Sequence, residues 1–211
     1  MLPLPRAFFD RPATEVGPDL LGCVLSHQTP EGIVAVELTE VEAYMGAADS
    51  ASHAYRGQTA RNAVMFGPPG YAYVYFTYGM HFCVNLVCQL EGSASAVLLR
   101  AGRIVAGEEL ARERRPSSRR AQDLASGPAR LCLALSIDRA QNGLDVCTEG
   151  SPLLVTSTTV SYENKICQGP RVGISSAADL PWRYWIDGDP TVSAYRAHVP
   201  RSRKPVTPSP R

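Results

Sequence analysis

The stretch Tyr71–Asn85 reads YAYVYFTYGMHFCVN and combines four tyrosines, two phenylalanines and a histidine around Gly79. Aromatic and β-branched residues favour extended structure, so the stretch predicts two strands, about Tyr71–Thr77 and His81–Val87, joined by a tight turn at the glycine. Tyr78 lies beside that turn, where a large aromatic side chain buries little of itself in its own hairpin. It is therefore either a wedge that enters a partner, such as a stack of DNA bases, or part of a small cluster folded back onto the protein.

Length and composition limit the class of protein to which this chain can belong. The chain has 211 residues, of which 45% are hydrophobic and 19% charged, so it can form a full core and is not a disordered chain. A net charge of +1 neither favours nor excludes a nucleic-acid partner. Only Lys165 and Lys204 among the 21 basic residues are lysines, and the others are arginines, which bind phosphate and stack on aromatic rings. Genomic composition could produce the same bias.

The six cysteines show no CxxC pair and no spacing typical of zinc ligands, so we expect no metal site. Buried free thiols in a reducing compartment are the simpler interpretation. The N-terminal residues include Pro3, Pro5 and Arg6 where a signal peptide needs an apolar run, and no apolar run has membrane-spanning length. We therefore expect a soluble cytoplasmic protein that does not contact a membrane.

A pair of carboxylates marks the sequence TEVEAY, Thr39–Tyr44, at the end of an expected strand. By strand alternation Glu40 and Glu42 point to one face and Glu37 to the other. Two neighbouring carboxylates repel each other, so on a partly buried face one of them should have a raised pKa and could act as a general base that activates water. A solvated edge strand is the alternative.

The segment Met45–Gly70 lacks apolar periodicity, and a loop of that length is usually functional or disordered. It contains His53 and the pair Arg61-Asn62, although a lone histidine is more often a structural residue than a catalyst. The apolar strand that follows the aromatic hairpin ends in Arg100. A charge there needs a partner, which could be the Glu42 carboxylate, a phosphate or solvent.

The remaining segments alternate between expected helices and strands. The expected helices are Pro12–Leu21 capped by Asp10, Ile104–Arg115, and Pro128–Leu135 capped by Ser126; the expected strands are Cys23–Ser26, Ile33–Val41, Ser95–Ala101, Leu153–Thr159 and Arg183–Asp187, after an extended entry over Met1–Phe9. The amides that begin the helix at Pro128, together with Arg130, could hold a phosphate.

Several of these motifs together resemble the alkyladenine (3-methyladenine) DNA glycosylase family. They are TEVEAY, the loop Ala51–Asn62, MFGPPGYAYVYFTYGMHFCVN (Met65–Asn85), VLLRA (Val97–Ala101), SGPARLCLAL (Ser126–Leu135) and GPRVGI (Gly169–Ile174). They occur in the family's order between about Pro12 and Asp187. The loop Arg103–Asp123 and the C-terminal tail resemble the family poorly.

The resemblance implies roles for the residues that match. Glu42 resembles the general base that deprotonates the attacking water, and Arg100 the residue that helps to position this water. The flipped base would lie between Tyr44 on one face and His53 with Tyr75 on the other.

Other matches concern recognition of the duplex. Asn85 resembles the pocket-floor residue that rejects the exocyclic amine of guanine. Tyr78 resembles the side chain that enters the duplex where the base was, with Met80 supporting it in the minor groove. His81 departs from the tyrosine expected in the vertebrate form. Phosphate contacts are expected from Arg61, Arg130 and Arg171.

The expected fold is α+β: one glycosylase domain over residues 1–195, with a curved, mainly antiparallel sheet, a protruding aromatic hairpin and surrounding helices, and then a flexible Arg- and Pro-rich tail over residues 196–211. The expected activity is removal of alkylated purines such as 3-methyladenine or 7-methylguanine from double-stranded DNA by a monomer without a cofactor. Because neither lysine lies in a matched motif, we expect a monofunctional hydrolase. The alternatives are a lesion-binding module without activity and a hydrolase of free nucleosides or RNA.

Overall fold

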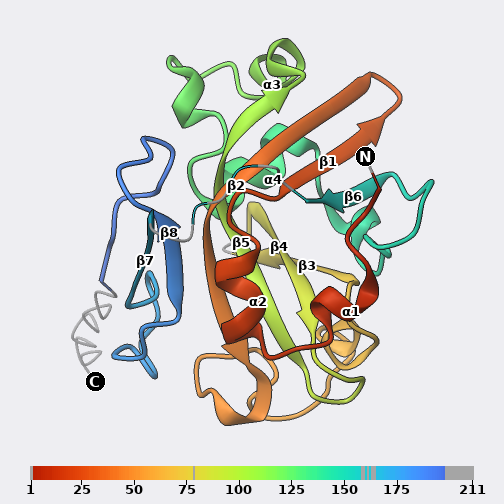
Figure 1. Cartoon of the computed structure of the whole chain (residues 1–211), viewed down its shortest axis with the longest axis vertical. Helices are drawn as coiled ribbons and strands as arrows, with labels where there is room; N and C mark the ends of the chain where they lie inside the picture. Colours follow the sequence, from red (N-terminus) through yellow and green to blue (C-terminus); the bar gives the residue numbers. More distant parts are fainter. Residues whose placement is uncertain (1, 78, 158–159, 161, 163–164, 198–211) are drawn as a thin grey trace, which may run out of the picture.

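The computed structural model describes residues 2–77, 79–157, 160, 162 and 165–197, and its centre is the long strand β2, Gly32–Met45 (Figure 1). Along one edge β2 pairs with β5 (Ser95–Ala106). Along the other edge it pairs first with β1 (Val24–Thr29), through residues 32–37, and then with β8 (Arg183–Ile186), through residues 40–42. The part of β2 that faces β8 is therefore the part that carries the two carboxylates of TEVEAY.

The other strands extend this sheet on both sides. In the described residues the strands join one sheet in the order β3-β4-β5-β2-β1-β6, and β7 is added next to β8. All of its pairings are antiparallel, and the sheet is strongly curled in Figure 1, as the sequence predicts. The remaining strands are β3 (Ala72–Thr77), β4 (His81–Cys88), β6 (Leu153–Thr156) and β7 (Ile166–Gly169).

Two short helices cover opposite faces of the sheet. Figure 1 shows α2 (Ala13–Asp19) in front of β2, whereas α4 (Pro128–Leu135) lies behind the sheet, where it packs on β4 and β5. The other α-helices are α1 (Arg6–Phe9) and α3 (Glu108–Arg114), and 3₁₀ turns occur at Gly46–Ala48, Ala63–Phe66, Ala121–Asp123 and Arg139–Gln141. Both faces of the sheet are therefore covered where it crosses the centre of the molecule.

One main apolar core joins these layers. Val16 of α2, Leu38 and Val41 of β2, and Leu131 and Leu135 of α4 are all fully buried in it. Burying one such side chain stabilises the fold by about 1.5–3 kcal/mol. Because this core spans both faces of the sheet, the described residues form a single α+β domain, as predicted.

Several predicted boundaries are wrong. β5 continues to Ala106, so the helix expected from Ile104 begins only at Glu108. Gly107 separates the two elements with a φ of 72°, a left-handed conformation that interrupts both strand and helix. Its absent side chain matters too, because a Cβ there would collide with the backbone oxygen of Ile33.

The predicted helix caps and the N-terminal entry also need correction. Pro12 and Gly127, rather than Asp10 and Ser126, occupy the N-cap positions of α2 and α4, and neither position has a side-chain capping bond. Asp10 instead ends α1, a helix within the segment expected to be extended. Strand β7 was not predicted, because four residues in a polar context give little periodicity.

The two strands predicted around Gly79 are confirmed. Tyr75 of β3 faces Cys83 of β4 across the ladder, and Gly79 has the positive φ of 69° that a tight turn requires. Tyr78, the predicted wedge, lies outside the described residues, as does the end of the strand predicted at residues 158–159.

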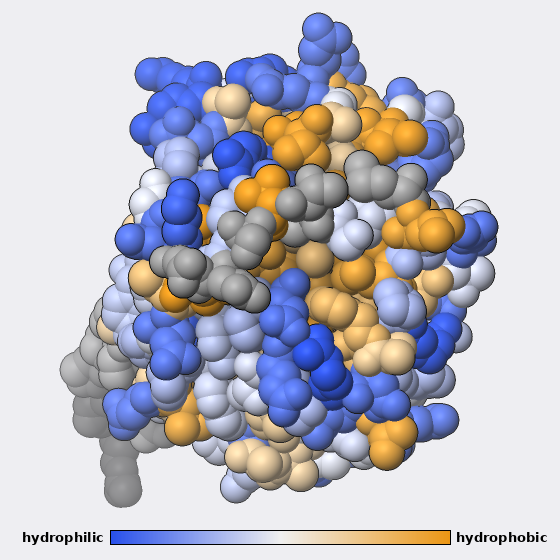
Figure 2. Space-filling model, viewed as in Figure 1, coloured by the Kyte–Doolittle hydropathy of each residue, from blue (hydrophilic) through white to orange (hydrophobic). Residues whose placement is uncertain are grey.

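Figure 2 shows the face of the molecule that carries α2, where hydrophobic residues gather mainly above and to the right of the centre and hydrophilic residues lie around them and at the lower centre. Among the described residues, no helix has both the length and the apolar character needed to cross a membrane.

Candidate active site

A cavity of about 240 Å³ lies on the α4 side of the sheet. Its walls come from the end of β2, from β3, β4 and β5, from residues 51–53, from the start of α4 and from residues 172–174. Segments more than a hundred residues apart in sequence therefore meet around it. Six predicted site residues line this one cavity: Glu42, Tyr44, His53, Tyr75, Asn85 and Arg100.

The Glu42 carboxylate is buried, and both of its oxygens accept hydrogen bonds. The backbone N–H of Val172 donates to Oε1 at 2.7 Å, and the hydroxyl of Tyr44 donates to Oε2 at 2.8 Å. The Nη1 of Arg100 lies 3.2 Å from Oε1. These contacts fix the carboxylate in one orientation on the cavity wall.

Arg100 connects the two carboxylates of TEVEAY. Its Nε donates to Oε1 of Glu40 at 2.8 Å while its Nη1 faces Glu42, so both carboxylates do lie on the same face of β2. Burial alone would lower the pKa of Arg100, but the charges of Glu42 and Glu40 raise it above its ordinary value. Of the three partners considered for Arg100, the structure selects the carboxylates, and the alternative of a solvated edge strand is wrong.

Glu40 forms a second layer behind Glu42. It also accepts from Nε of Arg183 at 2.8 Å, and from the backbone N–H and the hydroxyl of Ser193 at 2.7 and 2.9 Å. Burial would raise the pKa of Glu40, but Arg100, Arg183 and the bonds from Ser193 together lower it. Glu40 is therefore not the carboxylate with a raised pKa that the sequence suggested.

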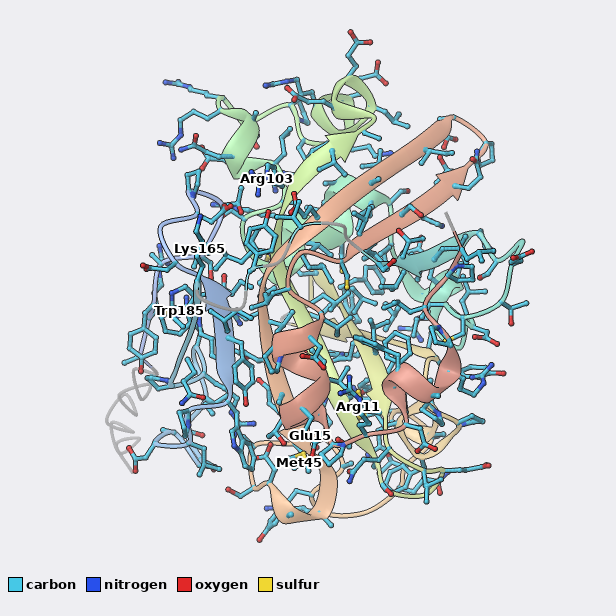
Figure 3. The ribbon with its side chains drawn as sticks, in the orientation of Figure 1. Arg11, Glu15, Met45, Arg103, Lys165 and Trp185 are labelled. Carbon is cyan, nitrogen blue, oxygen red and sulfur yellow. The ribbon has the colours of Figure 1, made fainter. Side chains whose placement is uncertain are left out.

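The Glu40 network reaches the side of the molecule that carries β7 and β8. Figure 3 shows Trp185 and Lys165 there. The guanidinium of Arg183 lies 4.7 Å from the Trp185 ring and donates to the backbone oxygen of Ser193 at 2.8 Å. No sequence motif pointed to Ser193, because its partner is 153 residues away.

Aromatic rings form another wall of the cavity. The imidazole of His53 meets the Tyr75 ring edge-on with centroids 4.5 Å apart, and Tyr73 stacks on Tyr75 at 5.5 Å. The Nδ1 of His53 lies 3.3 Å from the Tyr73 hydroxyl. Burial, and to a smaller extent the charge of Arg61, lower the pKa of His53, so its imidazole is neutral at neutral pH. Tyr73 was missed, although it shares its strand face with Tyr75.

Asn85 and Cys83 contribute from β4. The amide of Asn85 is buried and donates through Nδ2 to the backbone oxygen of Tyr73 at 3.2 Å, which fixes its orientation at the cavity. Burial raises the pKa of the Cys83 thiol, which also lines the cavity, so this thiol stays protonated at neutral pH.

The three arginines predicted to bind phosphate differ in their surroundings. Arg61 is exposed and donates to the backbone oxygen of Phe76 at 3.0 Å. Arg130 is exposed beside a shallow basic cavity that Arg115 and Arg120 also line. Burial, and then the charge of Arg130, lower the pKa of Arg115.

Arg171 does not fit its predicted role. Its side chain is 0% exposed and makes two bonds to the buried carboxylate of Asp49, at 2.5 and 2.9 Å. A guanidinium enclosed in this way has no surface to offer a DNA phosphate, and its charge is already balanced. Asp49 itself was not singled out in the sequence.

Near the turn between β3 and β4, Met80 is 67% exposed and its N–H donates to the backbone oxygen of Thr77 at 3.2 Å. The apolar side chain of Met80 is thus available to a partner. Tyr78 lies outside the residues that the structure describes.

Comparison with known proteins adds independent findings. Residues 7–190 match the family model described as methylpurine-DNA glycosylase (MPG). A protein of Streptomyces avermitilis is 59% identical over 204 residues, which cover 96% of each chain. Relatives from Leifsonia xyli subsp. xyli (50% identical, covering 92% of each chain) and Methanocella arvoryzae (48% identical, covering 90% of this chain and 95% of the relative) carry the same name, "Putative 3-methyladenine DNA glycosylase".

Proposed function

This chain belongs to the methylpurine-DNA glycosylase family, and on that premise we propose that it removes alkylated purines from double-stranded DNA by hydrolysing the N-glycosidic bond. The observation that carries the proposal is the single cavity shared by Glu42, Arg100, Tyr44, Tyr75 and His53. A fixed carboxylate there faces a chamber lined by aromatic rings, an arrangement suited to a flat base and a water molecule.

Access to the bond requires base flipping. Water cannot reach the sugar carbon of a stacked nucleotide, so the nucleotide rotates out of the duplex at a cost of a few kcal/mol. We propose that Tyr78 occupies the vacated space and that Met80 supports it in the minor groove. The exposure of Met80 beside the turn at Gly79 supports this assignment.

The aromatic walls favour a positively charged base. Purines such as 3-methyladenine and 7-methylguanine carry positive charge, and aromatic ring faces attract cations. We propose that the base lies between Tyr44 and the pair formed by His53 and Tyr75. A neutral His53 supports this arrangement, because a protonated imidazole would repel the cationic base.

Hydrolysis then needs a general base that is positioned to accept a proton from the attacking water. As the bond from the sugar carbon to the purine nitrogen breaks, its electron pair stays with the purine, whose positive charge is neutralised. The water oxygen bonds to the sugar carbon, and one water proton passes to Glu42. Arg100 holds Glu42 in place and balances its charge. The products are the free base and an abasic site, and the reaction requires no metal or organic cofactor.

We further propose that the enzyme is monofunctional and does not cleave the strand. Strand-nicking glycosylases use an amine to form a Schiff base. Lys165 is exposed on the side of the molecule that carries β7 (Figure 3) and is not among the residues that line the cavity, and Lys204 lies outside the described residues. Borohydride treatment during turnover should therefore trap no covalent protein–DNA adduct, and an adduct would contradict this proposal.

Phosphate binding is assigned to the exposed arginines Arg61 and Arg130. The basic cavity beside Arg130 supports the second of these. We propose that the protein acts as a monomer on DNA in the cytoplasm. Light scattering after size-exclusion chromatography, with and without a DNA duplex, tests the monomeric state.

The decisive experiment compares base release from methylated duplex DNA by wild type, Glu42→Gln and the matched control Glu91→Gln, whose carboxylate is exposed. Wild type and the control should release 3-methyladenine, whereas Glu42→Gln should bind the duplex and release nothing. A wild type that binds the duplex but releases no base would instead indicate either a lesion-binding module or an enzyme specific for another lesion, which duplexes containing hypoxanthine or ethenoadenine would distinguish. Tyr78→Ala should weaken base release from duplex DNA, and unchanged release would show that Tyr78 does not act as a wedge.

A further inference from the structure

Arg171 lies behind the groups that hold Glu42. Its guanidinium carbon is 4.6 Å from the centre of the Tyr44 ring, and the hydroxyl of that ring donates to Oε2 of Glu42. The next residue, Val172, donates its N–H to Oε1 of Glu42. The two oxygens of this carboxylate are therefore each held by a group that Arg171 contacts or precedes.

Arg171 is itself held with little freedom. Besides its two bonds to Asp49, it donates through Nη1 to the backbone oxygen of Ala43 at 2.9 Å. Asp49 in turn accepts from the backbone N–H groups of Met45 at 3.3 Å and Ala51 at 3.0 Å. The bonds to Asp49 and Ala43 tie the segment before Val172 to β2 and to the loop that follows it.

The cost of this arrangement argues that it serves more than stability. Both charged side chains, Arg171 and Asp49, are 0% exposed, and the loss of hydration can exceed the attraction of a buried ion pair. The Nε of Arg171 has no hydrogen-bond partner among the described residues. A buried ion pair whose desolvation is costly and whose hydrogen bonding is incomplete is better explained by the positions in which it holds its neighbours.

We infer that Arg171 is a positioning residue for the glycosylase reaction. Fixed by Asp49, it sets the plane of the Tyr44 ring and the direction of the Val172 N–H, and through them the orientation of Glu42. The inference rests on the proposed function, in which Glu42 activates water and Tyr44 stacks on the base. Stacking of the base and alignment of the water are thereby coupled through one buried side chain.

The test uses Arg171→Lys in the full chain. Lysine keeps the charge but cannot form two parallel bonds to Asp49 or stack as a plane on Tyr44. We expect the single-turnover rate of base release at saturating enzyme to fall roughly 10- to 100-fold, because a small misplacement of catalytic groups costs that much. The dissociation constant for lesion-containing duplex should change much less than the rate, because only the stacking of Tyr44 on the base is disturbed and the other contacts with DNA are retained.

A double-mutant cycle separates positioning from general damage. If Arg171 acts through Tyr44, the rate loss in Arg171→Lys with Tyr44→Phe will be smaller than the product of the two single losses. Arg114→Lys is the matched control. Arg114 is a largely buried arginine bonded to the Ala134 backbone and to Thr29, so its replacement should lower the melting temperature without changing the rate.

Each outcome bears on the inference. An unchanged rate in Arg171→Lys, or losses that simply multiply in the double mutant, would overturn it while leaving the glycosylase assignment intact. If Arg171→Lys does not fold, Asp49→Asn keeps the shape of the partner but removes its charge and should slow base release in the same direction; a full rate in that variant also overturns the inference. Absence of base release by wild type would remove both proposals together.

Discussion

Arg100 donates through Nε to Oε1 of Glu40 at 2.8 Å, in a pair whose two side chains are almost completely buried. Glu40 also forms an ion pair with Arg183, so this one carboxylate balances the charge of two guanidinium groups. Glu40→Gln should lower the free energy of unfolding at pH 7 by about 3 kcal/mol, because it leaves buried positive charge without its partner. Urea unfolding measures this loss. The exposed control Glu91→Gln should stay within about 0.5 kcal/mol of wild type, and an equally stable Glu40→Gln would contradict the account of the network.

The same carboxylate predicts how stability depends on pH. Burial acts to raise the pKa of Glu40, but Arg100, Arg183 and Ser193 hold it below its ordinary value of 4.5. A carboxylate with a lower pKa in the folded state stabilises the fold fully above pH 4.5 and loses this contribution as pH falls through the folded pKa. The free energy of unfolding should therefore decline more steeply below pH 4.5 in wild type than in Glu40→Gln. Parallel declines would show that Glu40 does not contribute.

His53 offers a spectroscopic prediction. Burial first, and the charge of Arg61 second, lower its pKa below the ordinary 6.5. Arg61→Gln should move the NMR titration midpoint of His53 upward, though not back to 6.5, because burial remains. Arg103→Gln is a suitable control, since Arg103 pairs with Glu37 and Asp189 instead. A midpoint that does not respond to Arg61→Gln would assign the whole shift to burial.

Gly107 provides a test of the junction between β5 and α3. Its φ of 72° is unfavourable for other residues, and an added Cβ would collide with the backbone of Ile33. Gly107→Ala should destabilise the protein by about 3 kcal/mol or more, because strain and collision add. Gly143 has a φ of 88°, and a Cβ added there would meet no atom within 4 Å, so Gly143→Ala should cost only about 1 kcal/mol. Equal losses in chemical denaturation would show that the contact with Ile33 relaxes.

The selectivity for 3-methyladenine over undamaged guanine should depend on Asn85. Its amide lines the cavity in an orientation fixed by the backbone of Tyr73. Asn85→Ala removes the group proposed to reject the exocyclic amine of guanine, so release of undamaged guanine should rise relative to 3-methyladenine. The loss of a polar contact of this kind changes discrimination by about 1–3 kcal/mol. Comparing release of both bases from one duplex measures it, and an unchanged ratio would place discrimination elsewhere.

The sequence predicted local features well where the chemistry is local. Alternating aromatic residues identified β3 and β4, and TEVEAY placed two carboxylates on one face of β2. The helix expected from Ile104 shows the limit of such patterns, because the apolar run Ile104–Ala106 suits a strand or a helix equally well. Its pairing with β2 and the left-handed Gly107 decided between them.

The candidate site was predictable only with the family resemblance, since spacing alone does not bring His53, Asn85 and Arg100 to one cavity. The predicted role of Arg171 in phosphate binding does not fit its surroundings, because a sequence does not reveal whether a charged side chain is paired with an opposite charge inside the protein. Its partner Asp49 is 122 residues away. Ser193 was missed for the same reason.

The bonds between Ser193 and Glu40 have a consequence for biosynthesis. Strand β8 and Ser193 are translated last among the described elements of the site, yet they help to hold Glu40 and, through it, Arg100. A nascent chain that has not yet extruded this segment from the ribosome would leave Glu40 without two of its partners. The candidate active site therefore matures only after Ser193 has left the ribosome, and a chain truncated before β8 would lack the contacts that hold Arg100 in place.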